Sequence, residues 1–266
     1  MPAWSLGADA VEHIRRQARW PARVDREWAW GGSTGLGARV CLLDSGVESA
    51  HPLVGAVAEA VAVTADGEVV EDDLGDVAGH GTACAGIIRS LAPECEITSV
   101  RVLGAGNKGS GKALLAGLRW AIDAGYNLVN LSLSTTKAEF VATLHELADA
   151  AYFKRTMLVA SAHNMPVESY PWRFSSVVSV GTHGEADPWT YYYNPTPPVE
   201  FFARGLDVEI AWPGGGTMRA SGNSFATPHI AGLAALILAK HPELTPFELK
   251  SALYLASTNV EVRHER

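Results

Sequence analysis

The sequence predicts an α/β fold of three layers, with a mostly parallel β-sheet flanked by helices. Short apolar runs occur that do not alternate strictly with polar residues, as expected for strands buried on both faces. They cover residues 97–103, 128–133, 157–160 and 177–180. Helical patterns separate successive runs, which is the βαβ alternation of a parallel sheet. A chain of 266 residues is long enough for one large domain of this kind.

The elements are predicted in order along the chain. Residues 9–20 predict a short charged helix, and the first strand is expected over 39–43, ending at Asp44. Two helices are then indicated by apolar residues that share one helical face. These residues are Leu114, Leu118, Ala121 and Ile122 in the first helix, and Phe140, Leu144, Leu147, Ala148 and Ala151 in the second. Gly125 is placed to end the first of them.

The last two predicted helices differ in character. Residues 228–239, PHIAGLAALILA, are apolar or small around the whole circumference, so this helix should run through the core. The segment GNSFAT before it is expected to form a turn that opens the buried helix. Thr245, Pro246 and Glu248 combine a capping box with a proline at the first helical position, which predicts a final helix from there.

Composition excludes several classes of function. The formal net charge is −8 and no basic cluster is longer than residues 13–16, so nucleic acid is not an expected partner. No run reaches the ~18 apolar residues of a membrane span, and the N-terminus lacks the pattern of a signal peptide. The three cysteines, Cys41, Cys84 and Cys95, are an odd number without CxxC spacing, which favours a reducing cytoplasm over disulfides or zinc. The oligomeric state is left open.

A glycine-rich stretch, GAGNKGSGKA at 104–113, invites a nucleotide-binding interpretation. Residues 106–112 match the P-loop pattern G-x-x-x-x-G-K, and a strand before and a helix after are the required context. Ala113 stands where the pattern needs a hydroxyl to bind magnesium. A P-loop NTPase is therefore kept only as a remote alternative.

Three residues have the types needed for nucleophilic catalysis. A serine hydroxyl becomes a good nucleophile when a histidine accepts its proton, and a carboxylate orients and stabilises that histidine. Asp44 ends the first strand, His80 begins a helical pattern, and Ser224 lies in SGNSFATPHIAG before the buried helix. These three are the candidate catalytic residues.

The segments around these residues resemble the subtilisin-like serine proteases, the subtilases. The family patterns D-[ST]-G, H-G-T and G-x-S-x-A-x-P occur here at 44–46, 80–82 and 222–228, in the same order. The resemblance implies a subtilisin-like fold and a serine endopeptidase that cleaves a peptide or protein substrate through an acyl-enzyme. It places a peptidase domain at 31–258, after an N-terminal extension at 1–30 and before a polar tail at 259–266. A catalytically inactive, subtilase-like peptide-binding module is the alternative.

The resemblance also implies an oxyanion hole made by the Asn164 side chain, in MLVASAHN, and the backbone N–H of Ser224. The chain departs from the family beside it, because His163 replaces the usual glycine. If the backbone there has a positive φ, this histidine is expected to be strained.

The substrate is expected to bind as an added strand between two edges. The resemblance places one edge at Leu103 and at Asn107, Lys108 and Gly109, and the other at Ser132, Leu133 and Ser134. Ala160, Ser161 and Ala162 are expected to line the pocket for the residue before the scissile bond. Glu168 either attracts a basic residue into that pocket or is a solvated loop charge, and the second interpretation is favoured.

No cofactor or metal is expected. Leu53 replaces the aspartate that holds calcium in many subtilases, and no loop is inserted after the helix of His80. Asp72, Asp73 and Asp76 form either a weak surface ion site or, as favoured, a solvated acidic loop. Cys84 is expected to be a small buried residue, with an inhibitory thiol as the sharper hypothesis.

Secreted family members carry a long folding pro-region ahead of the catalytic domain, whereas 43 residues precede Asp44. Either the domain folds unaided in the cell, or residues 1–30 act as an inhibitory strap, or a longer precursor was trimmed. A cytoplasmic protease needs restraint, so a restricted substrate such as a precursor peptide is expected.

Overall fold

The protein is described by a computed structural model that covers residues 4–17 and 20–261. Its centre is a sheet of nine strands in the order β10-β11-β9-β8-β7-β1-β4-β2-β3. The strands are β1 (Arg39–Asp44), β2 (Glu59–Val63), β3 (Val69–Glu71), β4 (Glu96–Arg101), β7 (Leu128–Leu131), β8 (Met157–Ser161), β9 (Val178–His183), β10 (Tyr191–Tyr193) and β11 (Phe201–Arg204). Only the pairs β10–β11 and β2–β3 at the two edges are antiparallel. The predicted mostly parallel sheet is confirmed.

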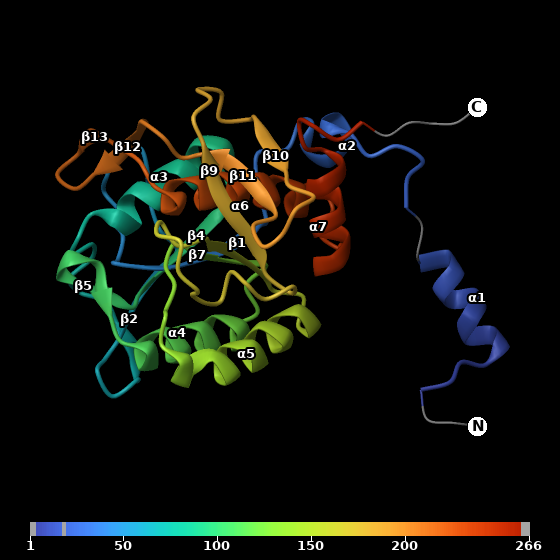
Figure 1. Ribbon diagram of the computed structural model, residues 1–266, viewed down its shortest axis with the longest axis horizontal. Helices are drawn as coiled ribbons and strands as arrows, with labels where there is room; N and C mark the ends of the chain where they lie inside the picture. The colour runs from blue at the N-terminus through green and yellow to red at the C-terminus, as the bar shows by residue number, and fades with distance from the viewer. Residues whose placement is uncertain (1–3, 18–19, 262–266) are drawn as a thin grey trace.

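Helices cover both faces of this sheet (Figure 1). One face carries α4 (Gly111–Asp123) and α5 (Val141–Phe153), and the other carries α2 (Arg26–Trp30), α3 (His80–Leu91) and α6 (Asn223–Lys240). The remaining helices are α1 (Ala8–Gln17), α7 (Pro246–Leu255) and the short 3-10 turns η1 (Ala105–Asn107) and η2 (Ala138–Phe140). Three layers therefore form, as the sequence predicts.

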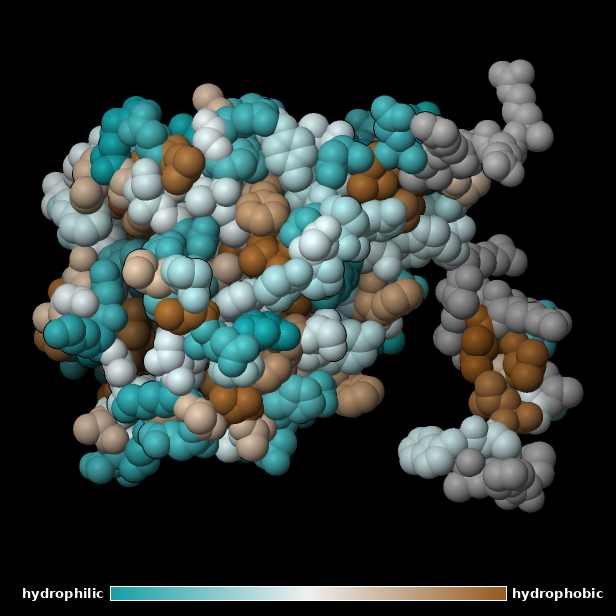
Figure 2. All heavy atoms as spheres, viewed as in Figure 1, coloured by the Kyte–Doolittle hydropathy of each residue, from teal (hydrophilic) through white to brown (hydrophobic). Residues whose placement is uncertain are grey.

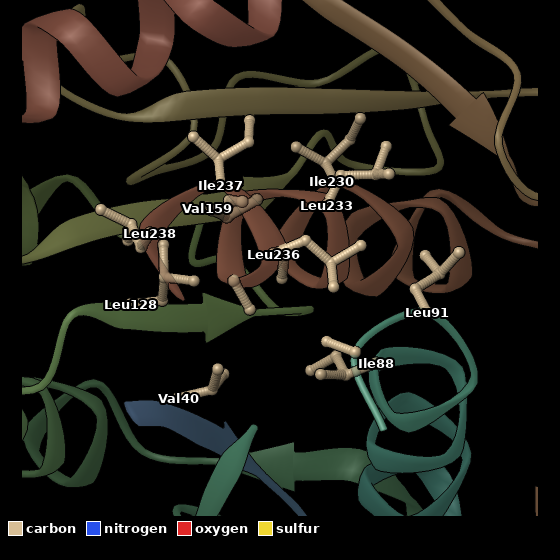
Figure 3. Packing of buried hydrophobic residues seen from close by; sticks show 14 of the residues in the cluster. Val40, Ile88, Leu91, Leu128, Val159, Ile230, Leu233, Leu236, Ile237 and Leu238 are labelled. Atoms are coloured by element: carbon tan, nitrogen blue, oxygen red, sulfur yellow. The ribbon is translucent and has the colours of Figure 1, made fainter. Parts of the chain in front are cut away.

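The larger core lies between the sheet and α6. Every residue of α6 from Phe225 to Leu238 is buried, in keeping with its uniformly apolar sequence. Figure 3 shows its side chains Leu233, Leu236 and Ile237 among the residues of this core, between the sheet and α3. The first two residues of α6, Asn223 and Ser224, are only partly buried, so the helix enters this core just after the turn that carries the serine.

The chain crosses the sheet in a way that creates a binding site. After β4 it passes beyond β1 to begin β7, so β1 lies between strands from the two halves of the sheet. Ligands in α/β sheets bind beside the carboxyl ends of strands at such a switch point. Asp44 ends β1 and Ser132 directly follows β7. Because these two strands are parallel neighbours, both residues lie at this edge of the sheet.

Two small hairpins lie outside the main sheet. The first joins β5 (Leu103–Gly104) to β6 (Lys108–Gly109), and the second joins β12 (Val208–Trp212) to β13 (Gly216–Ala220). The single run predicted over 97–103 is thus divided between β4 and β5. The glycine-rich stretch closes on itself as the β5–β6 hairpin, with Gly106 and Asn107 at positive φ in the turn.

The helix boundaries follow local signals with one correction. The side chain of Ser110 caps α4 by accepting the N–H of Ala113 at 3.0 Å, Gly125 follows α4 at φ +69°, and α7 has the predicted capping box at Thr245. The prediction that GNSFAT is a turn before the buried helix is wrong. Only Gly222 lies outside α6, because the helix begins at Asn223 and its first turn carries the serine.

The N-terminal segment has two parts. Val24, Ala29 and Trp30 are buried in the core beside α6, so the packed domain begins before the boundary predicted at residue 31. α1 lies apart from the packed domain, on the side opposite β5 (Figure 1), and Figure 2 shows apolar surface on it. Its Ile14 is exposed. The inhibitory strap stays a prediction, and residues 1–3 and 18–19 of that segment lie outside the described residues.

Within the described ranges, none of the helices combines the length and the apolar character that crossing a membrane requires.

Candidate active site

A cleft of about 710 Å³ opens at the carboxyl ends of the central strands. One wall is the β5–β6 hairpin with the start of α4, and the other is the segment that follows β7. The loop after β8 and the first turn of α6 close one end of it. His80, Asn164 and Ser224 all line this cleft.

Asp44 and His80 form a hydrogen-bonded pair. Asp44 ends β1 and is 1% exposed, and His80 opens α3. The Nδ1 atom of His80 donates to Asp44 at 2.8 Å from Oδ1 and 3.0 Å from Oδ2. The strand end and the helix come this close because Gly81 packs directly on the carbonyl group of Gly46, where any Cβ would overlap it. Both glycines belong to the motifs seen in the sequence.

The charge of Asp44 dominates the protonation of His80. Burial by itself lowers the pKa of His80, but the adjacent carboxylate and its hydrogen bond outweigh burial and raise that pKa above its ordinary value. The bond to Nδ1 leaves Nε2 as the ring atom that faces the cleft. The pair is therefore arranged to take up a proton at Nε2.

Asp76, four residues before His80, holds the turn that presents the histidine. Its Oδ1 accepts hydrogen bonds from the Ser45 hydroxyl at 2.7 Å and from the N–H groups of Ala78 and Gly79 at 3.0 and 2.7 Å. Its Oδ2 accepts the N–H and the hydroxyl of Thr82 at 2.8 and 2.6 Å. One carboxylate thus ties the residue after Asp44 to both sides of His80. The sequence interpretation missed this role.

Ser224 is the second residue of α6. The first N–H groups of a helix have no partner within it, so the N–H of Ser224 is free of the helical ladder and lies at the positive end of the helix dipole. The carbonyl oxygen of Ser224 accepts the Ser132 hydroxyl at 2.8 Å and lies 3.6 Å from Cys84 Sγ. Since the same sulfur is 3.9 Å from His80 Nδ1, the serine and the histidine flank one buried thiol.

Asn164 lies beside Ser224 and is held by Asn223. The N–H of Asn223 donates to Asn164 Oδ1 at 2.9 Å, which leaves the amide Nδ2 of Asn164 to face the cleft. The side chain of Asn223 donates to the carbonyls of Ala162 and His163 at 3.1 and 3.3 Å. A Cβ on Gly222 would stand 3.3 Å from Ser224 Oγ and 3.5 Å from Asn164 Nδ2, so these two groups face the same glycine.

His163 fits without the strain considered from the sequence. It is not among the non-glycine residues with positive φ, which within the described ranges are Trp4, Asn107, Arg155 and Asp207. Its imidazole turns into the loop, where Nδ1 accepts the N–H of Met165 at 3.0 Å.

Nine of the ten expected substrate-binding residues line the cleft. They are Leu103, Asn107, Lys108, Gly109, Ser132, Leu133, Ser134, Ser161 and Ala162. Ala160 does not, because its side chain points to the other face of β8 and is buried in the core with α4 and α5. Sequence reasoning missed further lining residues, among them Gly111, Leu114, Thr135, Lys137 and Phe225.

Glu168 does not belong to the cleft. It lines a separate hollow and forms an ion pair with Arg173 at 2.6 Å. Its carboxylate is therefore not available to attract a basic residue at the scissile bond, and that interpretation is wrong. Lys112, the lysine of the P-loop pattern, also lies outside the lining, with its side chain against Gly67 in the turn before β3.

Two of the three aspartates in the acidic loop, Asp72 and Asp76, have carboxylates that already accept hydrogen bonds from protein groups. Asp76 is occupied as described, and Asp72 accepts a bidentate bond from Arg101 at 2.9 to 3.1 Å. Cys41, Cys84 and Cys95 are free and buried. Cys84 completes a group with Asp44 and His80 whose ligand atoms lie within 4.8 Å of one another, but burial raises the pKa of its thiol, which disfavours the thiolate that a metal needs.

A hydrogen-bonded pair of an aspartate at a strand end and a histidine at a helix start, beside a serine in the first turn of a buried helix, is the arrangement of a serine endopeptidase. Comparison with known proteins gives the family, because the model of the subtilase family matches residues 35–265. The chain belongs to the subtilase family.

Two similar proteins and one solved structure support this. Subtilisin Savinase from Lederbergia lenta is 31% identical over 240 residues, covering 86% of each chain. M-protease from Shouchella clausii (strain KSM-K16) is also 31% identical, over 86% of this chain and 61% of its own length. The crystal structure of a cold-adapted subtilisin-like serine proteinase superposes with a TM-score of 0.69 at 27% identity, covering 83% of this chain and 82% of that one.

Proposed function

We propose that this subtilisin-like endopeptidase cleaves peptide bonds with Ser224 as nucleophile, His80 as general base and Asp44 as the group that orients His80. The observation that carries the proposal is the 2.8 Å hydrogen bond between Asp44 and His80 Nδ1, in a cleft that Ser224 also lines. Such a bond fixes the tautomer in which Nε2 is free to accept a proton.

The reaction then proceeds through an acyl-enzyme. Ser224 Oγ attacks the carbonyl carbon while its proton moves to His80 Nε2. The oxyanion receives hydrogen bonds from Asn164 Nδ2 and from the N–H of Ser224, which face it from the loop and from the helix N-terminus. The C–N bond breaks as His80 returns the proton to the leaving amine. Water repeats the sequence on the ester and releases the acid and Ser224.

The two alternatives have less support. An inactive peptide-binding module would not need the hydrogen-bonded pair of Asp44 and His80, which binding of a peptide does not use. A P-loop NTPase has no support in the geometry, since the glycine-rich stretch closes as a hairpin and Lys112 faces away from the cleft.

The substrate we propose is restricted, such as a precursor peptide, and is processed in a reducing compartment such as the cytoplasm. The support for the compartment is the set of three free, buried cysteines, which no disulfide uses. The restriction follows from the compartment, because a protease in the cytoplasm needs restraint. Fractionation of cells that express a tagged chain tests the compartment, and recovery of the tag outside the cytoplasm would contradict it.

We also propose that catalysis needs no calcium. At the family position stands Leu53, which is apolar and 51% exposed, and α3 passes to β4 through only residues 92–95. Calcium requires six to eight oxygen ligands, which these residues do not offer. The melting temperature and peptidase activity should be equal in calcium and in a chelator.

The test of the main proposal is labelling with a fluorophosphonate probe followed by peptide mapping. The probe should modify Ser224, and the label should be lost in Ser224→Ala and His80→Ala. Ser251→Ala, on α7 outside the cleft, serves as the matched control and should label as the parent does. A folded protein that fails to label at Ser224 would favour the inactive peptide-binding module.

A further inference from the structure

One end of the cleft carries positive charge in a protein whose net charge is −8. Two lysines, Lys108 and Lys137, line the cleft, and both are exposed. No aspartate or glutamate is among the described residues that line it. The cleft is therefore electrostatically unlike the surface of the rest of the molecule.

The segments that carry the two lysines are in contact with each other. Lys137 lies with Nζ 5.8 Å from the centre of the Phe140 ring, and that ring packs directly on Gly111 at the start of α4. Lys108, on β6, is three residues before Gly111. The Phe140 ring thus joins the segment of Lys137 to the hairpin of Lys108.

A third source of positive potential reaches the same place. α4 begins at Gly111, which itself lines the cleft, and a helix of 13 residues presents partial positive charge at its N-terminus. Two ammonium groups and the start of a helix therefore converge. Among the described residues, no carboxylate lies within ion-pair distance of either lysine.

The floor between these charges is apolar. Leu103, Leu114 and Leu133 line the cleft there, and Leu114 is only 5% exposed. Such a floor suits the methylene groups of a side chain whose charged end reaches the rim. Glutamate combines a short apolar stem with a terminal carboxylate.

We propose that this peptidase selects substrates with an acidic residue, glutamate above all, several residues before the scissile bond. The proposal rests on the peptidase function proposed above, since it assigns a preference to the same cleft. Lys108 and Lys137 would pair with the substrate carboxylate as the peptide lies between β6 and the segment after β7.

The experiment starts from a quenched fluorescent peptide that the enzyme cleaves, taken from a peptide library. A single glutamate is moved through positions two to five before the cut and compared with glutamine, which has the same shape without the charge. At one position kcat/KM should be about tenfold higher for glutamate, from two pairs of the strength usual near a surface. The ratio should fall in about 0.5 M salt, because added ions screen exposed pairs.

Charge reversal identifies the groups responsible. Lys108→Glu and Lys137→Glu should each reduce the glutamate-to-glutamine ratio by about three- to fivefold, and the double variant should prefer glutamine. Lys112→Glu changes the net charge equally from outside the cleft and should keep the parent ratio. Equal rates for glutamate and glutamine at every position, or an equal effect of Lys112→Glu, would overturn the proposal.

The fluorophosphonate probe separates this failure from failure of the peptidase function. Labelling of Ser224 with cleavage of glutamine peptides, but no preference for glutamate, refutes the acidic preference alone. No labelling and no cleavage of any library peptide refutes the peptidase function and the preference together.

Discussion

The candidate active site consists of two halves that are held by different means. In one half, Asp44 and His80 are joined by the Asp76 carboxylate, which accepts five hydrogen bonds from the two segments that carry them. In the other half, Asn223 joins the first turn of α6 to the loop of Asn164 through three bonds. Its backbone N–H donates to Asn164 Oδ1, and its side-chain amide donates to the carbonyls of Ala162 and His163. Each half is tied within itself by a residue that does not face the reacting atoms.

The difference between the halves lies in charge. Hydrogen bonds to an ionised group are roughly twice as strong as neutral ones. The half with Asp44 and His80, which we propose moves the proton, is therefore held by the stronger set, whereas the half with Ser224 and Asn164, which we propose binds the oxyanion, depends on the position of α6. The two halves should respond differently to substitution.

The largest effect is expected from Asp44→Asn, which breaks the first half at its centre. Loss of the carboxylate should lower kcat by about 10⁴, the scale seen when a triad aspartate becomes asparagine. In the parent, kcat/KM should rise as the pH passes upward through the raised pKa of His80, because the imidazolium below that pKa cannot accept the serine proton. The inflection should move to lower pH in the variant, and an unchanged pH profile would contradict this origin of the pKa.

Asn164→Ala breaks the second half. It should lower kcat by about 10²–10³ with a small change in KM, as removal of one oxyanion donor does in a relative of this family. Steady-state kinetics on one peptide measure both constants. A rise in KM with kcat unchanged would show that Asn164 binds the ground state instead.

Asp76→Asn tests the clamp of the charged half. It removes the charge from a carboxylate with five bonds, so the free energy of unfolding should fall by about 3 kcal/mol and kcat by at least tenfold. Urea titration and kinetics measure the two effects. Asp73→Asn in the same acidic loop is the control, and an equal loss there would contradict a specific role for Asp76.

The free energy of unfolding should fall in acid because of His229, which lies in α6, the helix that carries Ser224. His229 is 2% exposed and donates from Nδ1 to the carbonyl of Phe225. Burial lowers the pKa of His229 to about 4, so the unfolded chain takes up this proton at higher pH than the folded one. Its contribution to stability is complete above pH 6.5 and should fall by about 2 kcal/mol by pH 5. Urea titrations should show this slope in the parent and its absence in His229→Asn, with equal slopes contradicting the assignment.

The smallest effect is expected from Asn223→Ala, which removes the neutral clamp and keeps the backbone bond to Asn164. We expect about a tenfold loss in kcat, from one or two neutral hydrogen bonds, and little change in unfolding. Affinity for a peptide boronate should fall in parallel with kcat, because both depend on the oxyanion site. A loss of unfolding free energy as large as that of Asp76→Asn would remove the distinction between the halves.

Much of the architecture could be predicted because its signals are local. These signals each depend on a few neighbouring residues, and together they predicted the three layers correctly. They are the apolar runs, the caps at Ser110 and Thr245, and the wholly apolar sequence of α6. The three catalytic candidates were found from their motifs, and two of these motifs contain glycines that backbone packing requires, Gly46 and Gly81.

The predictions that failed or were missed depend on side-chain direction and on contacts between separate segments, which a sequence motif does not contain. Ala160 was expected in the pocket because its neighbours are there, but successive residues of a strand face opposite sides. Glu168 is not such an error, because the favoured interpretation of a solvated loop charge agrees with its exposed ion pair to Arg173 outside the cleft. The clamps at Asp76 and Asn223 depend on which groups surround them once the chain is folded.

The burial of α6 has a consequence for the thermal inactivation of this enzyme. Segments that open without global unfolding exchange their amide hydrogens quickly, whereas a helix enclosed on all sides opens only with the whole domain. Ser224 stands in the first turn of such a helix. If Ser224 is the nucleophile, as we propose, loss of peptidase activity on heating should follow deuterium uptake in α6, because both require the core to unfold.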